Sequence, residues 1–366
     1  METGVVTGIL NSTIALIFTW VAYKTGSYIY KYTPYSYPNA RISAMEAKML
    51  NSQKFNELAE SRTLQNFVVN LEDTQYRDYL SGLSEYSVEE IERALEKSLA
   101  GTYEMLYKML PKRSRDVFRL LLEEWDVRNI AAVVKAKLRG EPAIDYVSEI
   151  GLLLPKVKAM AEAKSMEEIL VILEGTPYEE PFRKLILGEI TASQFETELY
   201  RLYYGRLLDY ALSRKGDEKT ILLEFLRMKV DRLNIVTALR AKAAGMSAEE
   251  IRSLLLSGGS VDLEGVIRVD DVGMTLAELD STRYGKVIRE VREELERNFG
   301  VLERALDEYI LQRMVEVSRF YPLSIAAPIV YVLKKEREIK KLRAIVKLIA
   351  DGVEPERIKE MIGDLA

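Results

Sequence analysis

The sequence predicts an all-α fold built from three related helical units, because two landmarks recur three times in the same order. The first landmark is Leu-acid-x-Thr-x-Tyr, at residues 71–76, 173–178 and 279–284. The second begins with an acidic residue, at residues 126–130, 231–235 and 338–342. Both landmarks keep nearly the same spacing in each copy, which indicates an internal triplication. The unit is much longer than a solenoid repeat, so each copy is expected to form a small subdomain.

The second landmark predicts a long amphipathic helix in each unit. Apolar residues follow it with the spacing i, i+3, i+4, i+8, which places them on one face of a helix. The three stripes are Ile130, Val133, Val134 and Leu138; Ile235, Ala238, Leu239 and Ala243; and Leu342, Ile345, Val346 and Ala350. Gly140, Gly245 and Gly352 follow the stripes where helix C-caps are expected.

Other local signals predict where helices begin. Ser-x-x-Glu capping boxes precede amphipathic runs at Ser87, Ser165, Ser193 and Ser247. Proline is tolerated in the first turn of a helix and not further in, so Pro322 or Pro328 is expected at the start of the last long helix. No sustained alternation of apolar and polar residues predicts a sheet.

The repeats predict that the chain is divided into four segments. Residues 1–33 form a hydrophobic N-terminal helix, and the three helical units are residues 34–150, 151–259 and 260–366. A connector is expected near Gly140, and the sequence Ser-Gly-Gly-Ser at residues 257–260 predicts a flexible joint.

The N-terminal segment has no charged side chain from Thr3 to Tyr23. About 20 residues of helix can cross a bilayer, and Trp20 begins an aromatic belt followed by Lys24 and Lys31, the order of a cytoplasmic interface. Interspersed threonines and Asn11 dilute the hydrophobicity, so an amphipathic or packed helix is the alternative to a full span. We expect contact with a membrane or its proteins, and leave its form open.

The amino-acid composition excludes several classes of functional site. The chain of 366 residues has a net charge of −5 and contains neither histidine nor cysteine. It therefore offers no basic footprint for nucleic acid, no thiolate nucleophile and no histidine base. Residues 285–287 lack the upstream glycine and the Ser/Thr of a phosphate-binding loop. We expect no catalytic residue, no cofactor and no metal.

The polar landmark residues are interpreted as structural. A threonine near a helix start caps backbone N–H groups, and a tyrosine beside it buries its ring while its hydroxyl reaches a partner. These residues are Thr74, Tyr76, Thr176, Tyr178, Thr282 and Tyr284. The pairs Asp126/Asn129 and Asp231/Asn234 each lie on one helix face, where a polar network that fixes helix register is favoured over a ligand site.

Four further residues are candidates for contact with another protein. Lys135, Arg240 and Lys347 lie at the same distance past the landmark, beside the apolar stripe. They are interpreted as rim charges that an acidic partner could meet. Trp20 is the fourth candidate, because of its place in the N-terminal segment.

Taken together, these motifs resemble a known family. The chain opens its first unit with Tyr37-x-x-Ala40-Arg41-Ile42, repeats Leu-acid-x-Thr-x-Tyr, and carries Asp-x-x-Asn-Ile before a basic helix in two units. From about residue 34 to its end it resembles the C subunit of the archaeal A-type (V-type) ATP synthase, whose eukaryotic relative is the d subunit of the vacuolar ATPase. The third unit departs, with Lys341 in place of the asparagine.

The resemblance implies three pseudo-symmetric helical-bundle subdomains that form a funnel. It implies a non-catalytic rotor subunit, present as a single copy in a hetero-oligomeric complex. Such a protein links the central stalk to the membrane rotor ring and transmits torque during ion-driven ATP synthesis or hydrolysis. It would be peripheral on the cytoplasmic side of the cell membrane. The alternative is a membrane-anchored α-helical adaptor unrelated to a rotary ATPase.

Overall fold

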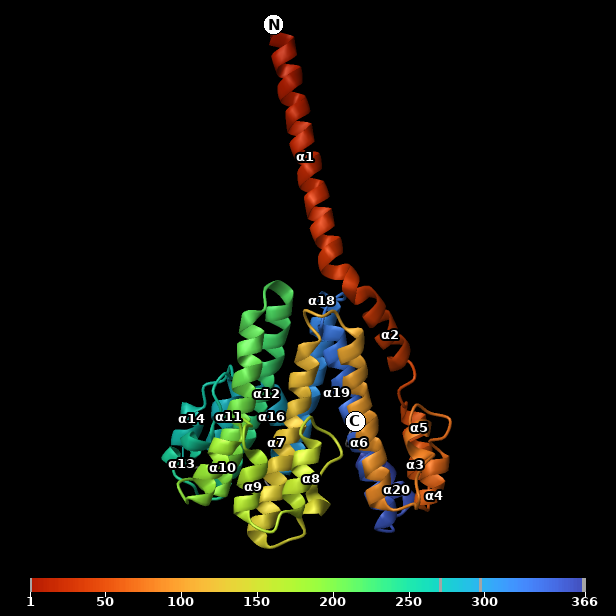
Figure 1. Cartoon of the computed structure of the whole chain (residues 1–366), viewed down its shortest axis with the longest axis vertical. Helices are drawn as coiled ribbons and strands as arrows, with labels where there is room; N and C mark the ends of the chain where they lie inside the picture. The colour runs from red at the N-terminus through yellow and green to blue at the C-terminus, as the bar shows by residue number, and fades with distance from the viewer. Residues whose placement is uncertain (1, 270–271, 296–297, 364–366) are drawn as a thin grey trace.

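The computed structural model describes residues 2–269, 272–295 and 298–363, without the side chains of residues 2–11 and 272–273. Within these ranges the regular structure is helical and no strand forms, which confirms the predicted all-α class. Helix α1 (Glu2–Tyr32) projects from one end of a body of antiparallel helices (Figure 1).

Six long helices form the body, and each packs against the next in chain order. They are α6 (Val88–Met109), α7 (Asp116–Arg139), α11 (Ala192–Ser213), α12 (Gly216–Ala243), α18 (Phe299–Phe320) and α19 (Ala326–Ala350). Helix α19 also packs against α6, which closes the six helices into a circle. The last part of the chain therefore contacts the first.

The remaining helices are short, and many of them lie toward the end of the body away from α1 (Figure 1). They are α2 (Ser36–Glu46), α3 (Ser52–Ala59), α4 (Leu64–Val69), α5 (Arg77–Leu80), α8 (Leu154–Glu162), α9 (Met166–Leu173), α10 (Glu179–Ile186), α13 (Ala248–Leu254), α14 (Glu264–Arg268), α15 (Val272–Asp280), α16 (Gly285–Glu290), α17 (Arg292–Leu295) and α20 (Pro355–Gly363), with 3₁₀ turns η1 (Thr33–Tyr35) and η2 (Ala143–Tyr146).

The short helices of each unit pack on a long helix of the preceding unit. Helix α8 packs on α7, helices α14 and α15 pack on α12, and α3 and α4 pack on α19. The third of these contacts joins the first unit to the last. At each junction, the second landmark of one unit lies on a long helix. The short helices of the following unit, which carry that unit's first landmark, lie close to it.

The helix ends agree with most of the local signals. The three landmark glycines have left-handed backbones, with φ of 72°, 73° and 70° at Gly140, Gly245 and Gly352, which confirms the predicted C-terminal stops. Pro328 lies in the first turn of α19, as expected of one of the two prolines.

Three of the four predicted serine caps form. Ser87 and Ser165 accept the N–H three residues later, and Ser247 makes a full capping box. The prediction at Ser193 is wrong: α11 is capped two residues earlier by Thr191, whose box is completed by Gln194. A glutamine serves as well as a glutamate at that position, since its amide oxygen accepts the same N–H.

The apolar stripes are buried at their first three positions and exposed at the fourth. Ile130, Ile235 and Leu342 have no exposed surface. Leu138 is 51% exposed, and Ala243 and Ala350 are exposed as well. The fourth position lies in or near the last turn and is rotated about 80° from the first, so it points past the covering helices.

Helix α1 does not pack along the body. Every residue from 12 to 30 is exposed, whereas the uncharged positions 3–11 lie outside the described side chains. In the described part of the chain, no helix combines the length and apolar character needed to cross a bilayer. The exposure of residues 12–30 counts against the packed helix considered above.

Truncation of a stripe residue should destabilise the fold. Ile235→Ala and Leu342→Ala each leave a cavity in a fully buried site, and each should lower the unfolding free energy by about 2–5 kcal/mol. Denaturant titration measures this loss. Leu138→Ala, from the same stripe pattern but half exposed, is the control and should cost under about 1 kcal/mol. Similar losses for all three variants would contradict the assignment.

Candidate functional site

The two landmarks meet where one unit joins the next. At the first junction, the Asp126 carboxylate accepts the backbone N–H groups of Leu152 at 3.1 Å and Leu153 at 2.7 Å. The Asn129 amide donates to the carbonyls of Ser148 and Ile150, both at 3.0 Å, and its oxygen accepts the Ser148 N–H. The pair therefore binds the segment that leads into the second unit.

The second junction repeats this arrangement. Asp231 accepts the N–H groups of Ser260 at 2.7 Å and Val261 at 3.1 Å. Asn234 exchanges two hydrogen bonds with the backbone of Leu256, both at 2.8 Å. The Tyr284 hydroxyl donates to Asp231 at 2.9 Å, so both landmarks meet at this carboxylate.

The joint predicted to be flexible is therefore held at both ends. A Cβ atom on Gly259 would collide with Oδ1 of Asp231, and one on Gly151 would collide with Oδ1 of Asp126. The glycine of the joint lets the backbone approach a carboxylate closely. Sequence reasoning took its glycines as a signal of flexibility, and that interpretation is wrong because the partners come from the preceding helix.

The third junction closes the circle through Glu338. This carboxylate accepts the Leu50 N–H and the Tyr76 hydroxyl, each at 2.6 Å, and the Gln75 amide at 3.0 Å. Glu338 stands where the other units have aspartate. Lys341, in place of asparagine, lies with its Nζ 5.4 Å from the Phe55 ring centroid.

The landmark threonines form the same turn three times. Each hydroxyl donates to the leucine carbonyl three residues earlier, at 2.7, 2.6 and 2.7 Å, and accepts the tyrosine N–H two residues later. The residues are Thr74, Thr176 and Thr282. This turn directs each tyrosine ring into the core, where Tyr76, Tyr178 and Tyr284 are at most 2% exposed. Tyr178 lies near the charges of Asp126 and Arg206.

The repeated cations pair within the chain. Lys135 lies 2.5 Å from Glu196, Arg240 lies 2.5 Å from Glu303, and Lys347 lies 3.2 Å from Glu92. Each acid is the fifth residue of the first long helix in the next unit, α11, α18 or α6. The cations considered for an external partner thus bridge successive units, the third pair again joining the last unit to the first.

A lysine that sequence reasoning missed lies at the closing junction. Lys335 is 1% exposed, with its Nζ 3.8 Å from the Tyr76 ring centroid and 3.2 Å from Glu338. Burial lowers the pKa of Lys335 to about 8, against the opposing attraction of Glu338. The signal available in the sequence was a lysine three residues before the landmark acid, which neither other unit has.

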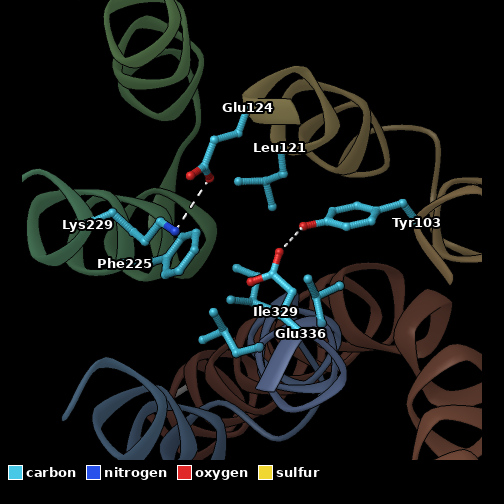
Figure 2. Close-up of a pocket in the computed structure, with 9 residues that line it drawn as sticks. Tyr103, Leu121, Glu124, Phe225, Lys229, Ile329 and Glu336 are labelled. Carbon is cyan, nitrogen blue, oxygen red and sulfur yellow. Dashed lines mark hydrogen bonds and ion pairs between the residues drawn. The ribbon is translucent and has the colours of Figure 1, made fainter. Parts of the chain in front are cut away.

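A narrow pocket lies inside the circle, between α6, α7, α12 and α19 (Figure 2). The Tyr103 hydroxyl donates to Glu336 at 2.7 Å, and Lys229 lies 3.4 Å from Glu124. Burial alone would raise the pKa of Glu124, but Arg128 and Lys229 outweigh it and hold the pKa at about 2. The interior is thus charged and internally paired. Among the described residues, no group of three or more acidic side chains could hold a metal ion.

Loss of the two hydrogen bonds between Asn234 and Leu256 should weaken the second junction. Asn234→Ala leaves the buried N–H and carbonyl of Leu256 unpaired, so the unfolding free energy should fall by about 1–3 kcal/mol. Asn56→Ala, at an exposed helical site, is the matched control and should change it little. Equal effects of the two substitutions in denaturant titration would show that Asn234 does not hold the junction.

Stability should depend on pH through Lys335. The amine titrates near 8 in the folded chain and near 10.5 when unfolded. Between these values the unfolded chain binds more protons, so stability rises with pH across this window. The unfolding free energy of wild type relative to Lys335→Met should therefore increase by about 2–3 kcal/mol from pH 8 to 10.5.

Urea titrations at several pH values measure this difference. Lys184→Met, at an exposed lysine, is the control and should show little change relative to wild type across the same window. A wild-type advantage over Lys335→Met that stays flat or falls with rising pH would contradict the burial of a charged amine.

Comparison with known proteins shows the family to which the chain belongs. The family model described as ATP synthase (C/AC39) subunit matches residues 38–361. The C subunit of the A-type ATP synthase of Thermococcus onnurineus (strain NA1) is 69% identical over 100% of both chains. Its counterpart from Desulfurococcus sp. (strain SY) is 69% identical over 99% of both chains. That of Methanocaldococcus jannaschii is 31% identical over 90% of this chain and 86% of its own. The chain with these three repeated junctions belongs to the ATP synthase (C/AC39) subunit family.

Proposed function

We propose that this chain is a non-catalytic rotor subunit of an A/V-type ATP synthase, which links the central stalk to the membrane rotor ring. Family membership and the names of its full-length relatives support this proposal. The observation that carries it is the closed circle of six long helices, joined at three junctions by carboxylates in corresponding places. A closed body of this kind suits the transmission of torque.

The mechanical argument rests on packing. Close-packed protein interiors have low compressibility and pass strain on to their neighbours. Each junction adds backbone hydrogen bonds that a carboxylate accepts, for example from the Ser260 N–H to Asp231. It also adds an ion pair between long helices, for example Arg240 with Glu303. A twist applied at one end of the circle would therefore reach the other end before any single unit could turn alone.

We also propose that residues 34–150, 151–259 and 260–366 are three related subdomains arranged as a funnel with pseudo-threefold symmetry. The support is the same order of elements in each: a short helix, a Thr-x-Tyr turn, a second short helix and two long antiparallel helices. The Lys135, Arg240 and Lys347 ion pairs occupy the same place in each junction. Residues 1–33 then form a separate N-terminal element.

The end that carries α1 is proposed to face the membrane ring from its cytoplasmic side, and the opposite end to receive the central stalk. Helix α1 exposes Leu16 at 71%, Phe18 at 71% and Trp20 at 61%, so it presents apolar surface that the body does not cover. Its polar residues fit a protein environment better than open lipid. We infer that α1 contacts ring helices or enters the lumen of the ring.

Capture of the chain from native membranes tests the function. An affinity-tagged chain, expressed at its natural level and solubilised gently, should copurify with central-stalk proteins and ring proteins. The tagged chain should be present as a single copy per complex, measured by quantitative mass spectrometry against the catalytic proteins. Recovery without either set of partners would overturn the proposal, and would favour an adaptor that acts outside a rotary enzyme.

Removal of α1 should weaken attachment to the ring and leave the body folded. Deletion of residues 2–30 keeps Lys31 and Tyr32, which hold the base of α1 through hydrogen bonds to Asp217, each 2.8 Å long. The shortened chain should retain its helical circular dichroism and its unfolding midpoint. Its retention on isolated rings in high salt should fall at least about tenfold, because the apolar surface of α1 is lost.

A triple variant distinguishes the effect of the apolar side chains of α1 from the effect of its length. Replacing Leu16, Phe18 and Trp20 together by glutamine keeps α1 at full length and should also lower retention. Ser27→Gln, at an exposed polar site on the same helix, is the control and should retain wild-type binding. Unchanged retention of both the deletion and the triple variant would leave α1 without a role in attachment.

A further inference from the structure

A cluster of basic residues surrounds the base of α1, at the tips of two helical hairpins. We name it the basic collar: Lys112, Arg113, Arg214 and Lys215. Arg113 and Lys215 line the pocket at the foot of α1 together with Lys31. Arg214 donates to the Arg113 carbonyl at 3.0 Å, so the tips of the two hairpins touch. Arg113 also donates to the Lys31 carbonyl and ties the collar to α1.

The collar has no carboxylate partners, although acids lie nearby. Among the residues that the structure describes, no ion pair involves any of its four members, whereas Asp217 binds Lys31 at 2.8 Å. Glu218 accepts a hydrogen bond from Ser114, and Asp116 lies 3.9 Å from Arg115. Burial raises the pKa of Glu218, while Arg214 and Arg113 attract its carboxylate without forming an ion pair. This one acid opposes four cations, so the collar remains positive although the whole chain has a net charge of −5.

Tyrosine rings hold the collar arginines in place. The Arg214 guanidinium lies 4.3 Å from the Tyr210 ring centroid, and the Arg113 guanidinium lies 5.5 Å from that of Tyr35. Stacking on an aromatic face positions a guanidinium without neutralising its charge. These cations are thus ordered and available to an anionic group from outside.

Apolar side chains accompany the collar on the same end of the body. Leu212, beside the second hairpin tip, is 53% exposed, and Phe320, at the end of α18, is 79% exposed. Lys24 lies further out on α1, with its ammonium 5.7 Å from the Trp20 ring centroid. Lys24 is about 10 Å of helix from Lys31, so a further cation and an exposed aromatic ring lie along α1 above the collar.

We propose that the basic collar binds the phosphate-bearing headgroups of anionic lipids, and that it does so while α1 extends into the membrane ring. Unpaired cations beside exposed apolar and aromatic side chains are the combination that anionic membrane surfaces attract. The opposite end of the body differs, since it exposes acids such as Glu174, Glu189 and Glu249 among its cations. The proposal rests on the orientation given under the proposed function, and adds a lipid class to that attachment.

Vesicle flotation with the full chain tests the collar without any ring. The chain is mixed with vesicles of phosphatidylcholine alone, or of phosphatidylcholine and phosphatidylglycerol in equal parts. Binding should be at least about tenfold stronger to the anionic vesicles and should weaken with added salt. Lys112→Gln, Arg113→Gln, Arg214→Gln and Lys215→Gln combined should remove most of that preference, because each cation near an anionic surface strengthens binding several-fold.

A matched variant controls for net charge. Arg62, Lys164, Lys184 and Arg357 are exposed cations away from the collar, also without ion pairs among the described residues. Their replacement by glutamine removes the same charge and should leave the preference for anionic vesicles intact. Circular dichroism melts should show that both quadruple variants fold.

The outcomes separate the collar from the ring attachment. A collar variant that binds anionic vesicles like wild type would overturn the lipid proposal, and its loss of retention on isolated rings would then assign the collar to an acidic ring protein. Equal binding of wild type to both vesicle types would also overturn the proposal. If wild type fails to bind isolated rings but still prefers anionic vesicles to neutral ones, the result would instead count against the proposed function.

Discussion

The circle of helices depends on one interaction, a buried carboxylate that holds the beginning of the following unit. A loop that passes against a packed helix must find partners for its backbone N–H groups. Asp126 and Asp231 supply them for the two internal connections, and Glu338 supplies one for the segment near Leu50. Because the third carboxylate joins the last unit to the first, every unit is held by a carboxylate of another unit. The ion pairs between long helices then add to contacts that the carboxylates have already made.

The sequence predicted features that depend on nearby residues. The all-α class, the glycine stops and most of the serine caps arise from residues within one or two turns, so their signals are local. It could not predict that residues 257–260 are held, nor the partners of Lys135, Arg240 and Lys347, because these partners belong to the next unit. A spacing pattern also does not show which positions of a stripe are covered, and Leu138 is half exposed. Repetition placed Glu338 at the third landmark, but it could not identify Lys335, which has no counterpart in the other two units.

Charge and apolar surface are distributed unevenly over this closed body. The charges inside the circle are paired, as in Glu124 with Lys229, and add rigidity. The end that carries α1 has the unpaired basic collar beside exposed Leu212 and Phe320, whereas the other end mixes exposed acids with exposed cations, such as Glu174 and Lys184. A part that connects two different partners needs two different ends and a stiff connection between them. The proposed position between stalk and ring requires this combination.

A double-mutant cycle at Tyr76 and Glu338 tests the closed circle most directly. The unfolding free energies of wild type, Tyr76→Phe, Glu338→Gln and the double variant are measured by denaturant titration. If the hydroxyl and the carboxylate join the first unit to the last, the effects should be coupled by about 1–3 kcal/mol. Additive effects, within about 0.5 kcal/mol, would mean that the two residues do not interact in solution. That result would contradict the closure on which this account of the protein rests.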